Sequence, residues 1–266
     1  MRSEIYDFES AMKKIFSVLS DIFFTRRCPG CGNLLPVLEE NIICDECRPD
    51  FTDISDKLFY VSELEFMKAV YLFSGPPRHG LHRFKFRNDG SAGRFFADRM
   101  YEMICKEKFL DTDCVIVPIP GNVKDTDREY VQAEFLGKRI ARKLRVPFVC
   151  DVIRKKKSVR SQTKCRTFAE RKKNAEKAFI LNKENAEKVN GKTVLLIDDI
   201  STTGSTLSSA AAVLKKAGAE RIYGICAAKT PSLRERKSRY IIPYPDKMKM
   251  TMVNINEVEK IKKSKD

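Results

Sequence analysis

Residues 192–206 read KTVLLIDDISTTGST, and the fold can be worked out from this stretch. A short apolar run rich in leucine and β-branched residues predicts a buried strand over 192–200. Two adjacent acids, Asp198 and Asp199, end that run, and hydroxyl residues with one glycine follow. The alanine-rich segment 206–219 then predicts a helix that stops at Gly218. In an open parallel sheet, ligands bind beyond the carboxyl ends of the strands, where these side chains would lie.

The turn after the acids has the composition of a phosphate-binding site. Backbone N–H groups at the start of a helix converge on an anion, the helix dipole favours it, and glycine lets the backbone approach closely. The groups expected to do this belong to Thr202, Thr203, Gly204, Ser205 and Thr206. No lysine follows the glycine, so the turn is not a Walker loop.

The acidic pair has a different expected partner, because carboxylates repel phosphate. We expect Asp198 and Asp199 to accept hydrogen bonds from vicinal hydroxyls of a sugar that carries the phosphate. The alternative is that Asp199 or Ser201 only caps the following helix.

Strands and helices alternate on both sides of this stretch. The predicted strands are 67–75, 113–120, 146–150, 192–200 and 221–229, and the predicted helices are 90–108, 128–144 and 206–219. Such alternation predicts an α/β fold, a Rossmann-like parallel sheet with helices on both faces.

Four of the nine cysteines form two CxxC pairs, separated by twelve residues. Two such turns present four thiolates to one ion, so we predict a structural Zn²⁺ site; an iron–sulfur centre or unpaired thiols are the alternatives. The predicted ligands are Cys28, Cys31, Cys44 and Cys47. No secretory signal precedes them, and we therefore expect cytosolic thiols and a cytoplasmic protein.

The chain has 266 residues and a formal net charge of +15. This excess favours an anionic partner such as nucleic acid, nucleotide phosphates or an acidic membrane surface; a solvated basic surface is the alternative. Segment 154–173 holds ten Lys or Arg and one acid, Glu170, and we expect a mobile loop there unless an anion binds. The apolar periodicity of 8–24 is interrupted by charges, which predicts an amphipathic helix and no transmembrane segment.

These patterns predict four parts of the chain. They are an N-terminal helix in 1–25, a zinc module in 26–55, an α/β domain in 60–230, and a basic, partly disordered extension in 231–266.

The stretch LLIDDISTTGST resembles the phosphoribosyl-pyrophosphate (PRPP) motif of type I phosphoribosyltransferases. That resemblance implies Asp198 and Asp199 on the ribose 2′- and 3′-hydroxyls, and residues 202–206 around the 5′-phosphate. It also implies Mg²⁺ with the pyrophosphate, held largely by the ligand.

The order of motifs over residues 20–230 resembles the ComF family of competence-associated proteins linked to DNA uptake. The four cysteines are followed by YLFSGPPRHGLHRFKFRNDGSAG, VPIP, REYVQAE, SQTKCRTFAERKKNAEKAF and the PRPP motif. This resemblance implies a type I phosphoribosyltransferase-like fold behind a small zinc-knuckle module.

The same resemblance implies roles for further residues. Lys85, Arg128 and Gln132 would contact the ligand, and the turn from Pro118 to Gly121 would bind pyrophosphate; for Lys85 the alternative is an ordinary surface lysine. REYVQ departs from the family's RGxNQ segment, with Glu129 for the glycine and Val131 for the asparagine. A flexible catalytic loop would carry Gln162, Arg171 and Asn174, with Arg171 joining the acidic pair as a catalytic residue.

Two functions are compatible with these motifs. The first is a phosphoribosyltransferase acting in DNA uptake and natural transformation, whose acceptor no segment of the sequence identifies. The second is a non-catalytic PRPP sensor that binds single-stranded DNA and other competence proteins. In the second case Phe84 and Phe86, in HRFKFR (82–87), would stack on bases; alternatively they form a buried strand face or a helix packing edge.

Overall fold

A computed structural model describes most of the chain between residues 26 and 231. The described residues are 26–36, 41–107, 113–121, 131–156 and 178–231, together with the backbone of two short strands, β7 (Tyr240–Ile241) and β8 (Met252–Val253). The predicted N-terminal helix, most of the basic loop 154–173 and nearly all of the extension from 232 lie outside the described residues.

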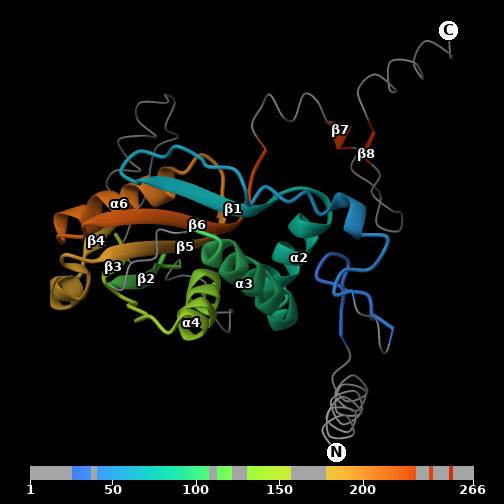
Figure 1. Ribbon diagram of the computed structural model, residues 1–266, viewed down its shortest axis with the longest axis horizontal. Helices are drawn as coiled ribbons and strands as arrows, with labels where there is room; N and C mark the ends of the chain where they lie inside the picture. Colours follow the sequence, from blue (N-terminus) through green and yellow to red (C-terminus); the bar gives the residue numbers. More distant parts are fainter. Residues whose placement is uncertain are drawn as a thin grey trace, which may run out of the picture.

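The core of the molecule is a four-stranded parallel sheet (Figure 1). In spatial order its strands are β1 (Phe66–Leu72), β6 (Arg221–Lys229), β5 (Thr193–Ser201) and β2 (Cys114–Pro118). The predicted strand over 192–200 is therefore β5, one of the two central strands. Strands buried on both faces are apolar at successive positions, which explains the unbroken run from Val194 to Ile197.

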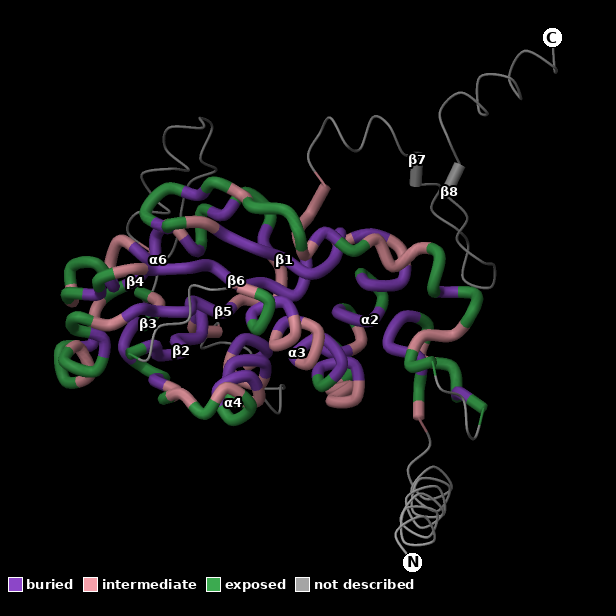
Figure 2. The backbone as a smooth tube through the Cα atoms, viewed as in Figure 1, coloured by how far each residue is buried: buried purple, intermediate pink, exposed green. Residues whose placement is uncertain are grey.

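Helices cover both faces of the sheet, as predicted. Helix α6 (Ser205–Lys216) covers one face, where Leu207 and Leu214 share a buried cluster with Val194 and Leu196 of β5. Helices α2 (Gly75–Phe86), α3 (Gly90–Cys105) and α4 (Gln132–Leu144) cover the other. Figure 2 shows the buried strands between these two helical layers. The predicted α/β fold is confirmed.

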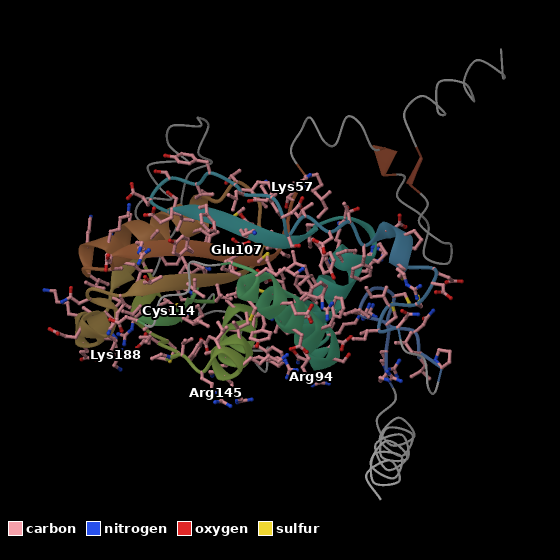
Figure 3. All side chains as sticks on the ribbon, in the orientation of Figure 1. Lys57, Arg94, Glu107, Cys114, Arg145 and Lys188 are labelled. Carbon is pink, nitrogen blue, oxygen red and sulfur yellow. The ribbon has the colours of Figure 1, made fainter. Side chains whose placement is uncertain are left out.

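Two ion pairs mark the amino-terminal edge of the sheet. Buried Lys68 of β1 donates to Glu107, just beyond the end of α3 (Figure 3), and Lys192 pairs with Asp113 at the start of β5 and β2. The carboxyl edge is the opposite one, and there β1, β2 and β5 are followed by helices α2, α4 and α6.

A small antiparallel hairpin packs beside α6. It consists of β3 (Ile153–Lys155) and β4 (Phe179–Leu181), which flank the basic loop in sequence and were not predicted. A 3-10 helix, Lys183–Val189, leads from β4 to β5. Ile153 and Phe179 are buried in the cluster that contains α6, so the hairpin anchors both ends of that loop to the domain.

Two sequence predictions differ from the structure. The segment 146–150 does not form a full strand: Phe148 makes one isolated parallel bridge to Ile116, because Pro147 has no N–H to extend the ladder. The strand predicted for 67–75 ends at Leu72, and α2 begins at Gly75. Prolines in its first turn favour this start, a signal that the sequence contains and the prediction missed.

Helix α2 contains most of the HRFKFR segment, so the alternative of a buried strand face is wrong. Phe84 is buried in the core, whereas Phe86 is 61% exposed at the end of the helix. Among the residues that the structure describes, no helix is both long enough and apolar enough to cross a membrane.

The cysteine-containing segment 26–50 packs directly on α2. A Cβ atom on Gly30 would lie 2.7 Å from Cβ of Pro76, and one on Gly80 would lie 2.0 Å from the carbonyl oxygen of Pro29. These contacts leave no room for a methyl group on either side. Glycine at both positions is therefore required by the close approach of the two backbones.

The substitution Gly80→Ala tests this contact. In an unobstructed helix, alanine would be the more stable residue. Here the methyl group would collide with Pro29, and we expect the free energy of unfolding to fall by about 1–3 kcal/mol in urea titrations.

Gly90→Ala, at the start of α3, is the matched control, because its Cβ would meet only ordinary contacts at 3.6 Å or more. We expect this control to change stability by less than about 0.5 kcal/mol. Equal stabilities of the two variants would show that the Gly80 contact is not required.

Candidate functional site

The carboxyl edge of the sheet brings four chain segments together. The Phe73 N–H donates to Lys229 O (2.8 Å), joining the start of α2 to the end of β6. The Thr230 N–H donates to Ser201 O (2.9 Å), and the Ile119 N–H donates to Ile197 O (2.9 Å). The ends of β1, β6, β5 and β2 thus meet around the stretch that contains the acidic pair.

Asp198 and Asp199 lie near the carboxyl end of β5, which finishes at Ser201. Each carboxylate accepts a hydrogen bond from the next backbone N–H: Asp199 N to Asp198 Oδ1 is 2.9 Å, and Ile200 N to Asp199 Oδ1 is 2.8 Å. Side chains alternate along a strand, so Asp199 lies on the α2 side and Asp198 on the α6 side. The two acids therefore border the carboxyl edge from both faces of β5.

Lys85 of α2 is the basic partner of Asp199. Its Nζ lies 3.7 Å from Asp199 Oδ2, and both side chains are largely shielded from solvent. Lys85, expected from the family resemblance to contact a ligand, is thus brought to the acidic pair by the helix that follows β1.

The pKa of Asp198 lies well above its ordinary value. Burial is the main cause, the neighbouring charge of Asp199 adds to it, and Lys85 acts in the opposite direction. Cys226 of β6 lies level with Asp198 in the sheet. The pKa of its thiol is also raised, mainly by burial and further by the charges of Asp198 and Asp199. Two buried like charges repel each other, so hydrogen-bond donors from a ligand would stabilise this pair.

The turn after β5 has the geometry of an anion-binding helix start. Gly204 is the N-cap of α6 and has a left-handed backbone, φ +80°, where a Cβ would lie 2.7 Å from Val61. Thr203 Oγ1 donates to Ser205 Oγ (3.1 Å) and accepts from the Ser205 N–H (3.4 Å). The N–H groups of the first helical turn point out of the helix at this position.

The alternative role of Asp199 or Ser201 as a helix cap is wrong. No side chain of either residue caps α6, because Asp199 accepts the N–H of Ile200. The Ser201 hydroxyl is buried and, within the described part of the chain, has no hydrogen-bond partner. An unpaired buried hydroxyl at this edge is a further group that a ligand would satisfy.

Lys229 is a basic residue of this edge that the sequence prediction missed. Its Nζ donates to Thr202 O (3.4 Å) and Thr230 O (3.3 Å), and it lies 5.0 Å from the centroid of the Phe59 ring. Lys229 is the last residue of β6, so the rule that located the acidic pair at a strand end would also have located this lysine.

The proline turn after β2 lies beside the acidic pair. Pro118 is level with Ile197, one residue before Asp198. A Cβ on Gly121 would lie 2.9 Å from Val131, which precedes α4, and Gln132 at the start of α4 is 6% exposed. The structure thus brings Gly121 and Gln132 close to each other. The other expected site residues, Arg128, Gln162, Arg171 and Asn174, lie outside the described residues.

An aromatic column runs along the exposed side of α2. The His82 ring stacks on Phe73 with centroids 6.0 Å apart, and it lies 5.4 Å from the Phe86 ring. Lys85 Nζ is 6.0 Å from the Phe86 centroid. The column therefore ends next to the lysine that contacts Asp199.

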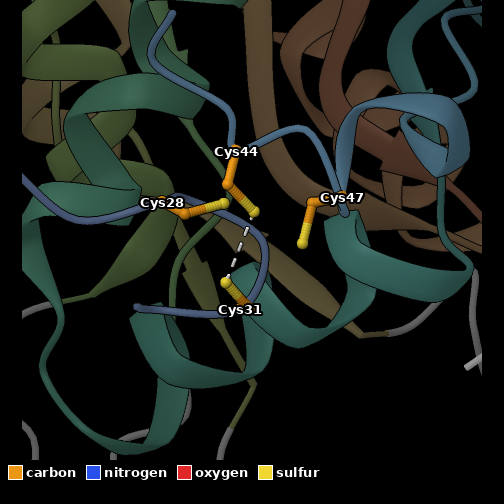
Figure 4. A group of neighbouring side chains, drawn as sticks. All are labelled: Cys28, Cys31, Cys44 and Cys47. Carbon is orange, nitrogen blue, oxygen red and sulfur yellow. Dashed lines mark hydrogen bonds between the residues drawn. The ribbon is translucent and has the colours of Figure 1, made fainter. Parts of the chain in front are cut away.

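The four predicted metal ligands form a second site, remote in sequence from the first. Their sulfur atoms all lie within 4.8 Å of one another, and Figure 4 shows them converging from two turns. Sulfur ligands of a tetrahedral zinc ion at ~2.3 Å lie about 3.8 Å apart. The separation of Cys31 Sγ and Cys44 Sγ is 3.8 Å, so the cluster has the dimensions that such an ion requires.

Burial and charge at this cluster also suit a metal. Cys28 and Cys47 are buried. A hydrogen bond from the Cys47 thiol lowers the pKa of Cys28 to about 4, and the same contact raises the pKa of Cys47. Within the described residues, this is the one group of three or more His, Cys, Asp or Glu side chains that could hold a metal ion.

Comparisons with known proteins agree with this architecture. A family model described as "Phosphoribosyl transferase domain" matches residues 132–259. Competence protein ComFC of Bacillus subtilis (strain 168) is 28% identical over 218 residues, which cover 80% of this chain and 78% of that protein. Competence protein F of Haemophilus influenzae is 27% identical over 230 residues, which cover 77% and 99% respectively.

A solved structure of an adenine phosphoribosyltransferase aligns with 18% identity and a TM-score of 0.38, covering 59% of this chain and 79% of that chain. The sequence relatives span most of both chains, and the four cysteines precede the matched domain. This chain is therefore similar over most of its length to two competence proteins, and its residues 132–259 match the phosphoribosyl transferase domain family.

Proposed function

We propose that this protein binds PRPP together with Mg²⁺ at the carboxyl edge of β5 and acts in DNA uptake. The observation that carries the proposal is one continuous stretch of chain. In it, a carboxylate pair ends a central strand and a left-handed glycine opens the next helix three residues after Ser201. Carboxylates suit the ribose hydroxyls, and the N-terminus of α6 suits the 5′-phosphate.

The surroundings supply charge for the rest of the ligand. Lys85 and Lys229 lie at the acidic pair and at the phosphate turn, and the turn 118–121 adjoins them. Because Asp199 faces the cationic Lys85, we assign the pair to the ribose hydroxyls rather than to a metal ion. In this proposal Mg²⁺ therefore arrives with the pyrophosphate and is held mainly by the ligand's own oxygens.

As a transferase, the protein would act through positioning and charge. The carboxylates would fix the ribose, and basic groups would stabilise the leaving pyrophosphate while a nucleophile attacks C1. The hairpin β3–β4 holds both ends of the basic loop near this domain, which fits a segment that covers the site. The competence relatives support the DNA-uptake context, and thiols that hold a metal favour a cytoplasmic location.

Isothermal titration calorimetry with PRPP and Mg²⁺ tests the acidic pair. Hydrogen bonds to a charged acceptor are worth about 1.5–3 kcal/mol, so we expect Asp199→Asn to bind PRPP ~10- to 100-fold more weakly. Asp198→Asn should weaken binding in the same direction.

Asp113→Asn is the matched control, since this carboxylate lies at the amino edge and its side chain is 64% exposed. We expect its affinity for PRPP to equal that of the unsubstituted protein. Unchanged affinity in both site variants, or no PRPP binding by the unsubstituted protein, would contradict the proposal.

We also propose that the four-cysteine cluster holds one structural Zn²⁺, with no open position for catalysis. Cys31→Ser should remove most of the zinc found by metal analysis of the purified protein, and should lower its unfolding temperature. Cys150→Ser replaces an exposed cysteine outside the cluster and should leave the zinc content unchanged. Full zinc content in Cys31→Ser would rule out the four-sulfur site.

A sensor that binds single-stranded DNA is the second candidate, and the aromatic column on α2 favours it. Phe84 is buried and cannot stack on a base, whereas Phe86 is exposed beside Lys85. We expect the affinity for an oligothymidine to fall with salt, and Phe86→Ala to weaken it ~5- to 100-fold. Leu58→Ala, at another exposed apolar position, is the control.

Affinity that does not depend on salt, or equal affinities of the two variants, would exclude this DNA site.

Release of pyrophosphate from PRPP in the presence of a nitrogen-base acceptor distinguishes the transferase from the sensor.

A further inference from the structure

Helix α2 contacts both the cysteine cluster and the acidic pair. Arg83 and Lys85 are two residues apart, and each reaches a different site. Lys85 Nζ lies 3.7 Å from Asp199 Oδ2 at the carboxyl edge. Arg83 lies against the cysteine-containing segment, so one rigid element connects two sites that are far apart in the sequence.

Arg83 binds the backbone of the first CxxC turn with its whole guanidinium group. It donates to Cys28 O and Pro29 O, both at 3.1 Å, and also to Gly30 O. Its Nε donates to Asp89 Oδ2 at 3.0 Å, and the side chain is only 15% exposed. The planar guanidinium group of arginine carries several N–H donors in a fixed arrangement, which matches three convergent carbonyls and a carboxylate. A lysine ammonium group could not donate to all four acceptors.

The contact between the turn and the helix is tight as well as polar. Gly80 approaches Pro29, and Gly30 approaches Pro76, at distances that exclude a methyl group. A shift of the CxxC turn would therefore be transmitted to the backbone of α2, because close-packed surfaces do not deform gradually.

A metal ion bound by the four cysteines would fix the position of these carbonyls. Cys28 and Cys31 flank Pro29 and Gly30, so the carbonyls that receive Arg83 lie between two of the four ligands. A tetrahedral ion fixes the separation of the sulfur atoms and thereby the shape of the turn. Without an ion, only thiol contacts such as Cys31 Sγ to Cys44 Sγ and the backbone hydrogen bonds of the turn itself would hold it in place, and these are weaker than metal–sulfur bonds.

We propose that the metal-loaded cysteine cluster positions α2 through Arg83, so that Lys85 faces Asp199 and the ribose-binding carboxylates stay paired for PRPP. Arg83 is in this sense a positioning residue for the PRPP site, and the inference rests on the proposed PRPP binding. Coupling between two sites is reciprocal: if zinc raises the affinity for PRPP, PRPP raises the affinity for zinc by the same factor.

The test measures zinc affinity of the full chain by competition with a fluorescent zinc chelator. Each titration is run in Mg²⁺ alone and in Mg²⁺ with saturating PRPP, and PRPP binding is measured separately by calorimetry. We expect PRPP to tighten zinc binding in the unsubstituted protein on the order of 10-fold, within the usual range of such coupling.

Two arginine variants separate this coupling from direct chelation of zinc by PRPP. Arg83→Met removes the side-chain hydrogen bonds from α2 to the CxxC turn, and we expect its zinc affinity to change less than 2-fold with PRPP. Arg78→Met replaces an exposed arginine of the same helix and should retain the full coupling. Arg83→Lys keeps the charge without the fork and should restore only part of it.

The outcomes distinguish the two proposals. A protein that binds PRPP but has the same zinc affinity with and without it would overturn the coupling alone. Full coupling in Arg83→Met would do the same. Absence of PRPP binding in the unsubstituted protein would overturn the PRPP proposal and the coupling with it. If Arg83→Met does not fold, the comparison in the unsubstituted protein decides the question.

Discussion

Two adjacent carboxylates at the buried end of the central strand impose the main constraint on this structure. Charges of the same sign in a poorly solvated place are unfavourable, and the raised pKa of Asp198 reflects this. The surrounding groups act to compensate. Two backbone N–H groups donate to the pair, and Lys85 is brought to within 3.7 Å of Asp199 by α2, the helix that follows β1.

The parallel topology is what makes this compensation feasible. In a parallel sheet of order β1–β6–β5–β2, all four strands end at one edge, and β1, β5 and β2 are followed there by helices α2, α6 and α4. Lys229 at the end of β6 and the turn after β2 therefore flank the acidic pair without any contribution from distant loops. The same edge carries the N-terminus of α6, so positive groups and helix dipole are concentrated where a sugar phosphate would lie.

Helix α2 connects the cysteine cluster to the carboxyl edge of the sheet. A short cysteine-rich turn has little core of its own, and this one is packed on the helix by close glycine contacts and by Arg83. The helix that stabilises the cluster is also the helix that presents Lys85. A module that looks like a separate unit in the sequence is thus continuous, in packing, with the carboxyl edge of the sheet.

Much of this protein could be read from local sequence pattern. The strand over 192–200, the helix ended by Gly218, the α/β class and the sulfur ligands follow from residue order, because hydrophobic periodicity and ligand spacing are local properties. The acidic pair and the hydroxyl turn were recognisable for the same reason. Helix α2 was missed, since its glycines and prolines are also common in loops.

Only the tertiary structure decided which distant residues meet. Local pattern does not specify strand order, so neither the pairing of Lys85 with Asp199 nor the place of Lys229 beside the turn after β5 could be derived from it. The three carbonyls that receive Arg83 lie more than fifty residues earlier in the chain. The sequence by itself determined the strand β5, the hydroxyl turn after it and the four clustered cysteines. The packing of α2 between the cysteine cluster and β5 decided how these parts are connected, because burial and close contact depend on the whole fold.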